Sequence, residues 1–172
     1  MVNKNAIFFD RDGVLIKAPV DKDNKPKSIK TYDQIEWVDN IENICSFYKK
    51  NYYLIMVTNQ PDVTRKVNSL KNVEKINVEI KKKLDLDDIF VCYCDSKCFN
   101  RKPSPGMVLD AKKKYNLNLS KCFFIGDRWR DVEASYNAGC ESILLDYNYN
   151  EEIKRKPSYK INNLKEIYEI IK

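Results

Sequence analysis

The sequence has 172 residues, of which 43% are hydrophobic and 33% are charged, a composition typical of a soluble globular protein. Its 31 basic and 25 acidic residues give a net charge of +6, and it contains no histidine. The lack of histidine excludes Ser-His-Asp and Cys-His hydrolases and metal sites built on imidazole. Acid–base chemistry must therefore come from carboxylates, lysines, tyrosines or cysteines.

Targeting and charge patterns favour a cytoplasmic protein with no membrane partner. No apolar stretch approaches the roughly 20 residues that a membrane helix needs, and residues 1–5 lead into a short strand without a secretory signal pattern. The basic residues are spread along the chain, which favours a solvated surface over a nucleic-acid partner. We expect a monomer without a disulfide framework, although it has six cysteines.

Short apolar runs alternate with segments of helical periodicity along the chain. In residues 39–50, Ile41, Ile44 and Tyr48 recur at helical spacing after Asp39, a predicted cap. In chain order we predict a strand at 6–9, a helix at 39–50, a strand at 52–57, a helix at 69–84, a strand at 89–93, a helix at 105–115, a strand at 122–125, a helix at 131–138, a strand at 142–145 and a helix at 163–171.

This alternation predicts an α/β fold, a Rossmann-like doubly wound parallel sheet with helices on both faces. We expect residues 1–172 to form a single domain. The insertions at about 11–34, a predicted flap, and at about 92–100, a short loop with cysteines, leave no room for a separate cap domain.

Polar residues follow the predicted strands at the points where the strands end. In open parallel sheets, ligands bind beyond the carboxyl ends of the strands. The residues at these ends are Asp10, Thr58, Asn59, Arg101, Lys102 and Asp127. Such a mixture of carboxylates, cations and a hydroxyl suits a phosphate held beside a divalent metal ion.

Two carboxylates, Asp10 and Asp12, follow the end of the first strand and can point into one cleft. Gly13 then permits a sharp turn. A carboxylate can attack phosphorus to give an acyl phosphate, and a second carboxylate can protonate the leaving alkoxide. For that task Asp12 must be partly protonated, which a neighbouring like charge favours.

Four segments carry a resemblance to a known family. They are Asp-Arg-Asp-Gly-Val at 10–14, Val-Thr-Asn-Gln at 57–60, Arg-Lys-Pro-Ser-Pro-Gly-Met at 101–107 and Ile-Gly-Asp-Arg-Trp-Arg-Asp at 125–131. In order and spacing they resemble the four motifs of the haloacid dehalogenase (HAD) superfamily. Over roughly residues 5–147 the chain is most similar to the branch of histidinol phosphatases and heptose-bisphosphate phosphatases.

The resemblance implies a role for each matching residue. Asp10 would be the nucleophile, Asp12 the general acid–base, Thr58 part of the phosphate cradle and Lys102 the cation beside the phosphoryl group. The carboxylates of Asp10 and Asp127, with the backbone carbonyl of Asp12, would bind Mg²⁺. Asp131 either orients the site or caps the helix that it begins.

The resemblance also implies substrate contacts from side chains around the catalytic motifs. The expected contacts are Asn59, Arg65, Arg101 and Arg128. Arginine can grip a phosphate or a carboxylate through two parallel hydrogen bonds. These residues predict a small phosphorylated substrate.

The cysteine loop departs from the family pattern of a zinc-binding loop. Cys92, Cys94 and Cys98 are candidate ligands, but no histidine is present, and Asn100 stands where the last cysteine would be. Structural zinc sites need four ligands, nearly always cysteine or histidine. We therefore expect a loop without zinc, and this change leaves the substrate open.

The resemblance implies a Mg²⁺-dependent phosphatase that works through an aspartyl phosphate on a small metabolite, most simply a sugar or polyol phosphate. Histidinol phosphate and a polynucleotide 3′-phosphate stay open as alternative substrates. A catalytically silent binding module is the alternative from a different class.

Overall fold

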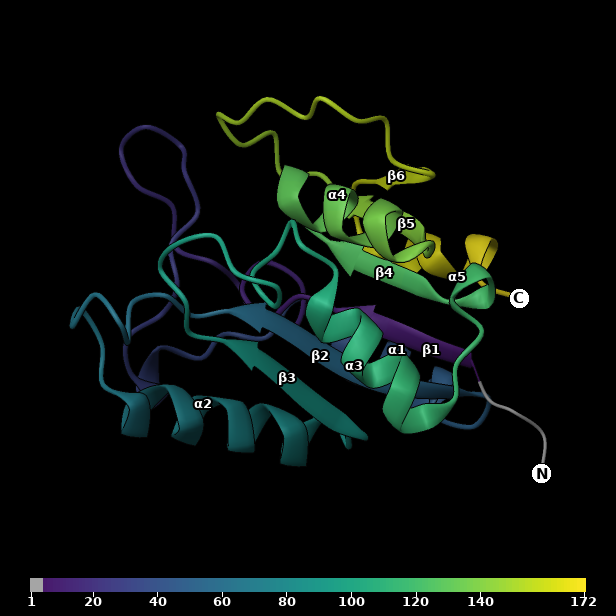
Figure 1. Cartoon of the computed structure of the whole chain (residues 1–172), viewed down its shortest axis with the longest axis horizontal. Helices are drawn as coiled ribbons and strands as arrows, with labels where there is room; N and C mark the ends of the chain where they lie inside the picture. Colours follow the sequence, from purple (N-terminus) through teal and green to yellow (C-terminus); the bar gives the residue numbers. More distant parts are fainter. Residues whose placement is uncertain (1–4) are drawn as a thin grey trace.

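The computed structural model describes residues 5–172 (Figure 1). Residues 1–4, which belong to the predicted single domain and to the segment where no secretory signal was expected, lie outside the described residues. Six parallel strands form one sheet in the order β3-β2-β1-β4-β5-β6. The strands are β1 (Asn5–Phe9), β2 (Tyr52–Asn59), β3 (Asp88–Cys92), β4 (Phe123–Gly126), β5 (Glu141–Leu145) and β6 (Tyr159–Ile161).

Helices cover both faces of the sheet, as the doubly wound fold predicted (Figure 1). The α-helices are α1 (Ile41–Tyr48), α2 (Leu70–Lys83), α3 (Gly106–Tyr115), α4 (Trp129–Ala138) and α5 (Ile167–Ile170). Buried residues of α1, α2 and α5 share one core layer, and those of α3 and α4 share the other. The predicted α/β class is confirmed.

The central strand β1 shows why the sheet is buried on both faces. Ile7 and Phe9 belong to the core layer with α1, α2 and α5, and Ala6 and Phe8 belong to the other layer. All four side chains are fully buried. Because side chains alternate along a strand, an uninterrupted apolar run supplies both layers at once.

Several predicted boundaries shift by one or two residues. Strand β2 continues to Asn59, and α4 begins at Trp129 instead of residue 131 because Asp131 accepts a hydrogen bond from the Arg128 amide at 3.1 Å. The predicted cap Asp39 is wrong, since Asn40 is the N-cap of α1 with a φ of 68°.

The C-terminal end differs most from the prediction. Strand β6 was not predicted, because Tyr159 and Lys160 are exposed and only Ile161 is buried. The helix predicted at 163–171 is a 3₁₀ turn, η3 (Leu164–Glu166), followed by the four residues of α5. Asn163 caps this turn by accepting a hydrogen bond from the Lys165 amide.

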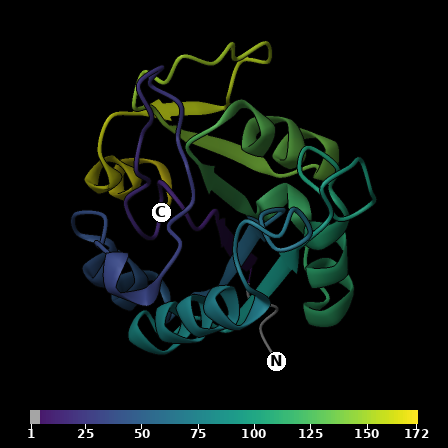
Figure 2. The same cartoon turned by 90° about the vertical axis from the view of Figure 1, so that its left-hand side faces the viewer.

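The insertion between β1 and α1 folds back over the carboxyl ends of the strands (Figure 2). It contains isolated bridges, among them Val20 with Pro26, and the short turn η1 (Tyr32–Gln34). Asp21 holds the tip of this flap by accepting hydrogen bonds from two backbone amides, at Asp23 and Lys25, both at 2.9 Å. No helix in residues 5–172 is long and apolar enough to cross a membrane.

Candidate active site

Residues from four neighbouring strand ends meet at one edge of the sheet. They line a small cleft of about 70 Å³. Its walls are Asp10, Asp12, Pro26, Lys27, Ser28, Thr58, Asn59, Lys102, Arg128 and Arg130. Parallel strands deliver their carboxyl ends to the same edge, so residues as far apart in sequence as Asp10 and Arg130 share one cleft.

Lys102 lies at the centre of this cleft and is 2% exposed. Its Nζ is 2.9 Å from Asp10 Oδ1 and 2.7 Å from Asp131 Oδ1, and it donates to the Val57 carbonyl at 3.0 Å. Burial by itself lowers the pKa of this amine, but the negative charges of Asp10 and Asp131 raise it by more than burial lowers it. The pKa of Lys102 is therefore raised overall. Lys102 is therefore held as a cation.

Three buried carboxylates surround this cation. One carboxylate oxygen from each of Asp10, Asp127 and Asp131 lies within 4.8 Å of the others. Burial, followed by the charges of Asp10 and Asp131, raises the pKa of Asp127 well above its usual range. Burial also raises the pKa of Asp10, against the lowering effect of Lys102. The site concentrates negative charge where little water reaches it.

Asp127 is the carboxylate with the most unmet hydrogen-bonding capacity. Within residues 5–172, both of its oxygens are buried and neither has a hydrogen-bond partner of ordinary geometry. The Tyr149 hydroxyl interacts with this carboxylate, and burial together with the charge of Asp127 raises the pKa of Tyr149. Leaving buried polar atoms unpaired is unfavourable by about 1–3 kcal/mol each, and more for charged groups. An oxygen-binding cation between Asp127 and Asp10 would relieve this.

Gly13 allows the approach of Asp127 to the loop after β1. A Cβ on Gly13 would lie 1.9 Å from Asp127 Oδ2, and the residue has a φ of +94°. Only glycine readily combines this backbone conformation with so close an approach.

Asp12 lines the cleft, and three side chains hold its carboxylate. Oδ2 accepts hydrogen bonds from Arg11 Nη2 at 2.9 Å, Ser28 Oγ at 3.0 Å and Gln60 Nε2 at 3.0 Å. Arg11 is fully buried and also donates to Asn77 of α2 at 3.0 Å. The sequence interpretation did not include this network, which joins the flap to the strand end.

The end of β2 supplies a hydroxyl group to the cleft and a side-chain amide that holds the Lys102 backbone in place. Thr58 is buried, and its Oγ1 accepts a hydrogen bond from Gln60 Nε2 at 2.9 Å. The Asn59 amide donates to the Lys102 carbonyl and accepts from the Lys102 amide, both at 3.0 Å. Asn59 thus lines the cleft while its amide fixes the backbone of Lys102.

A second cleft of about 350 Å³ adjoins the first and shares six wall residues with it. Its wall contains seven cationic side chains and one carboxylate, Asp62. The cations are Lys25, Lys27, Lys30, Arg65, Arg101, Arg128 and Arg130. We call this second space the cationic cleft. It can hold an anionic group next to Asp10.

The three arginines predicted to bind substrate all line the cationic cleft, and each has a protein partner. Arg65 pairs with Asp95 and is half-exposed, and Arg101 donates to the Cys94 carbonyl. Arg128 pairs with Glu151 through two nitrogens. Their roles toward a substrate stay predictions.

Sequence reasoning missed several side chains in these walls. Arg130 lines both clefts, and Lys27 and Ser28 reach them from the flap. The sequence left open whether Asp131 orients the site or caps its helix. In the structure its Oδ1 pairs with Lys102 in the site, and its Oδ2 accepts the Arg128 amide at the start of α4. The one sequence signal that could have identified Arg130 as a site residue was its position between Asp127 and Asp131 in the fourth segment.

Three cysteines, at the end of β3 and in the loop that follows it, lie together. The sulfur atoms of Cys92, Cys94 and Cys98 are all within 4.8 Å of one another, and Cys92 Sγ is 3.5 Å from Cys98 Sγ. All six cysteines of the chain are free. Three thiols fall one short of the four ligands of a structural zinc site, so the expected absence of zinc stays a prediction that metal analysis can test.

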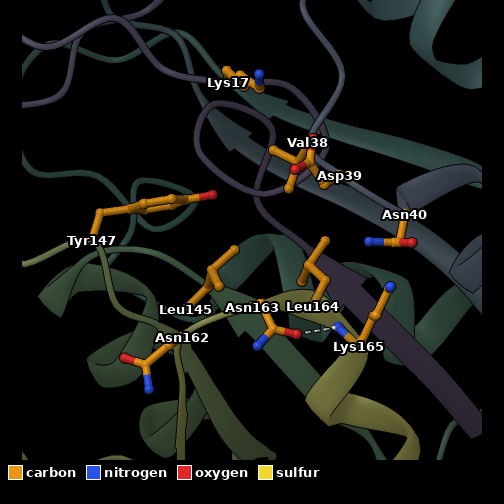
Figure 3. A pocket seen from close by; sticks show the side chains of 10 residues that line it. All are labelled: Lys17, Val38, Asp39, Asn40, Leu145, Tyr147, Asn162, Asn163, Leu164 and Lys165. Atoms are coloured by element: carbon orange, nitrogen blue, oxygen red, sulfur yellow. Dashed lines mark hydrogen bonds between the residues drawn. The ribbon is translucent and has the colours of Figure 1, made fainter.

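A separate cavity of about 490 Å³ contains none of the predicted site residues (Figure 3). The side chains of Val38, Leu145, Tyr147 and Leu164 face this space (Figure 3). It lacks the grouping of carboxylates with a buried cation that defines the cleft at Asp10, so we place the active site at Asp10.

Comparison with known proteins agrees with this geometry. A family model described as polynucleotide kinase 3 phosphatase matches residues 5–132, and one described as HAD-hydrolase-like matches residues 99–167. The chain is 32% identical over 174 residues to D-glycero-alpha-D-manno-heptose-1,7-bisphosphate 7-phosphatase of Campylobacter jejuni, covering 97% of this chain and 95% of the relative. It is 29% identical to the D-glycero-beta-D-manno-heptose-1,7-bisphosphate 7-phosphatase of Pasteurella multocida, covering 98% of this chain and 97% of that one.

Among solved structures, the fold is similar to D,D-heptose 1.7-bisphosphate phosphatase from B. bronchiseptica complexed with magnesium and phosphate. The TM-score is 0.79 at 24% identity, with 96% of this chain and 97% of the other covered. The chain is a phosphatase that belongs to the haloacid dehalogenase superfamily, in the branch that contains the heptose-bisphosphate phosphatases.

Proposed function

We propose that this phosphatase removes one phosphoryl group from a small sugar bisphosphate, with Asp10 as the nucleophile and Mg²⁺ as the cofactor. The observation that carries the proposal is the cationic cleft beside the buried Asp10–Lys102 pair. One phosphate of the substrate would lie at Asp10, and the other would lie among the arginines and lysines.

The donor set fits Mg²⁺, which prefers oxygen ligands and keeps several waters. The carboxylates of Asp10 and Asp127 and the backbone carbonyl of Asp12 would hold it, and the unpaired oxygens of Asp127 support this assignment. When bound, the ion would draw electron density from the phosphoryl oxygens and offset the negative charge of the carboxylates.

In the first step, an Asp10 carboxylate oxygen forms a bond to phosphorus while the bond from phosphorus to the sugar oxygen breaks. The Arg11 amide and Lys102 Nζ both contact Oδ1, at 2.7 and 2.9 Å, and Oδ2 takes no part in these contacts. Asp12 gives its proton to the departing sugar alkoxide. Lys102 stabilises negative charge on the phosphoryl oxygens.

In the second step, water attacks the phosphorus of the aspartyl phosphate, and Asp12 takes the proton that the water releases. The bond from phosphorus to Asp10 breaks, which yields inorganic phosphate and restores both carboxyl groups. Thr58 supports the phosphoryl group in both steps, and Gln60 orients its hydroxyl. Splitting one displacement into two lowers the barrier of each.

The sugar bisphosphate assignment follows from charge and size. A cleft of about 350 Å³ is at the small end of the range for small-molecule sites. Its seven cations suit a second phosphate better than a neutral or cationic group such as the amine of histidinol phosphate. The named activity of relatives that match nearly the whole chain supports the same choice.

A polynucleotide 3′-phosphate is the second candidate. It is favoured by the description of the family model that matches residues 5–132 and by the same cationic cleft. A polynucleotide would extend well beyond a space of this size, so we rank it below the sugar bisphosphate.

Phosphate release from heptose 1,7-bisphosphate, histidinol phosphate and a 3′-phosphorylated DNA oligonucleotide, each with Mg²⁺, tests the proposal. We expect the highest kcat/KM with the bisphosphate, and Asp10→Asn should lower it by at least about a thousandfold. Asp110→Asn, on an exposed position of α3, is the matched control and should behave as wild type. Preferred turnover of the oligonucleotide would overturn the substrate assignment, and retained activity in Asp10→Asn would overturn the mechanism.

We also propose a cytoplasmic location and a monomeric state. Six free cysteines support a reducing compartment. Size-exclusion chromatography with light scattering tests the oligomeric state.

A further inference from the structure

The Arg128 side chain is fixed by Glu151, a residue outside the four catalytic segments. Glu151 Oε2 accepts a hydrogen bond from Arg128 Nε at 2.9 Å, and Glu151 Oε1 accepts a second one from Arg128 Nη2. The two side chains are 22% and 13% exposed. This paired geometry restricts the guanidinium more than a single hydrogen bond does.

Glu151 approaches Arg128 from outside the clefts. Arg128 lines both the small cleft and the cationic cleft, and Glu151 lines neither. Glu151 instead lines a neighbouring cavity with Trp129 and Pro103. Because Glu151 takes the Nε and Nη2 edge of the guanidinium, Nη1 lies outside the pair.

The segment that carries Glu151 is attached to the flap. The side-chain amide of Asn24, at the flap tip, donates a hydrogen bond to the Asn148 carbonyl at 2.8 Å. The backbone carbonyl of Asn24 accepts a second hydrogen bond from the Asn150 backbone amide at 3.1 Å. In Figures 1 and 2 the flap and the segment after β5 lie at the same end of the molecule. The flap also supplies Lys27 and Ser28 to the clefts. The contacts of Asn24 therefore connect the flap, which forms one wall, to the segment that holds Arg128 in the other wall.

We propose that Glu151 is a positioning residue that orients Arg128 toward the second anionic group of the substrate and so sets the preference for a bisphosphate over a monophosphate. This inference rests on the proposed function, because it requires a second phosphate in the cationic cleft. Glu151 itself does not touch the substrate. Its effect passes through the guanidinium of Arg128.

The test compares KM and kcat for heptose 1,7-bisphosphate and heptose 7-phosphate, which differ by the second phosphate. We expect Glu151→Ala to raise KM for the bisphosphate about five- to twentyfold, the scale of one partly buried charged contact. KM for the monophosphate and kcat for both substrates should stay within about twofold. Glu151→Gln, which keeps one acceptor oxygen, should lie between Glu151→Ala and wild type.

Glu152→Gln is the matched control, because Glu152 is the next residue and its side chain is 78% exposed. It should leave both KM values unchanged. Equal increases for the two substrates after Glu151→Ala would indicate a general structural role and overturn the proposal. A fall in KM would show that Glu151 competes with the substrate, and an unchanged KM would show that it has no role. Both results overturn the proposal.

Arg128→Ala separates this inference from the proposed function. We expect it to remove the preference for the bisphosphate, and Glu151→Ala added to it should have no further effect. If Arg128→Ala leaves the preference intact, both the second-phosphate site at Arg128 and the role of Glu151 fail. If Arg128→Ala removes the preference and Glu151→Ala does not reduce it, only the role of Glu151 fails.

Discussion

Single residues decide how closely the acidic groups of the site approach one another. Gly13 leaves space for the Asp127 carboxylate, and Gly126 leaves space for Asp131, whose Cβ would be 2.1 Å from an added Cβ. Lys102 then supplies the positive charge that holds Asp10 and Asp131 together. The site combines small residues, where carboxylates must approach, with one buried cation.

Gly13→Ala should disrupt the site by more than the backbone strain of a positive φ alone would cause. The added Cβ would overlap Asp127 Oδ2 at 1.9 Å, so the carboxylate must move. We expect a loss of unfolding free energy of about 3 kcal/mol or more and a fall in kcat/KM of about a hundredfold, as expected for a displacement of about 1 Å. Thermal unfolding and phosphate release measure the two effects.

Gly139→Ala is the matched control, because Gly139 has a similar φ of +82° and open space around its Cβ position. It should lower stability by only about 1–2 kcal/mol and leave kcat/KM unchanged. Equal effects of the two substitutions on kcat/KM would contradict the proposed clash with Asp127.

At the scale of elements, α4 begins where the site needs a carboxylate. Asp131 caps this helix through Oδ2 and pairs with Lys102 through Oδ1. The apolar pattern of residues 131–138 predicted the helix, but its first turn could not be read from that pattern, because Trp129 and Arg130 are only partly buried. The start depends on a hydrogen bond that appears only when the strand end and the helix meet.

Two substitutions of Asp131 separate its two roles. Asp131→Asn keeps an oxygen that can accept from the Arg128 amide but removes the charge beside Lys102. We expect its unfolding free energy to stay within about 1 kcal/mol of wild type while kcat falls, since Lys102 loses one of its two acidic partners.

Asp131→Ala removes the cap as well, and it should lower the unfolding free energy by about a further 1 kcal/mol. Chemical denaturation and steady-state kinetics on both variants provide the comparison. If Asp131→Asn keeps the kcat of wild type, Asp131 is a cap and not part of the charge arrangement.

For the whole molecule, the sequence predicted the parts of the fold that depend on continuous burial. Ile7 and Phe9 in β1, and Val73, Ile76 and Ile80 in α2, lie at spacings that only a strand or a helix can bury on the required side. Strand β6 has a single buried residue and follows a long polar segment, so no such pattern marks it.

The candidate site was predictable only where side chains follow strand ends. Asp10, Thr58, Lys102 and Asp127 were predicted to gather there, and they do line or lie beside one cleft. Ser28 of the flap reaches the clefts, and Glu151 reaches Arg128 from outside them, through chain reversals that depend on tertiary contacts. Local patterns in the sequence do not specify such contacts.

The central claim is that Asp10 accepts the phosphoryl group. A crystal structure of the protein soaked with beryllium fluoride and Mg²⁺ tests it most directly, since beryllium fluoride imitates a phosphoryl group on a carboxylate. We predict the adduct on an Asp10 carboxylate oxygen, with Lys102 Nζ within hydrogen-bond distance of a fluorine. An adduct on another residue, or an Asp10 side chain turned away from the beryllium, would contradict the account.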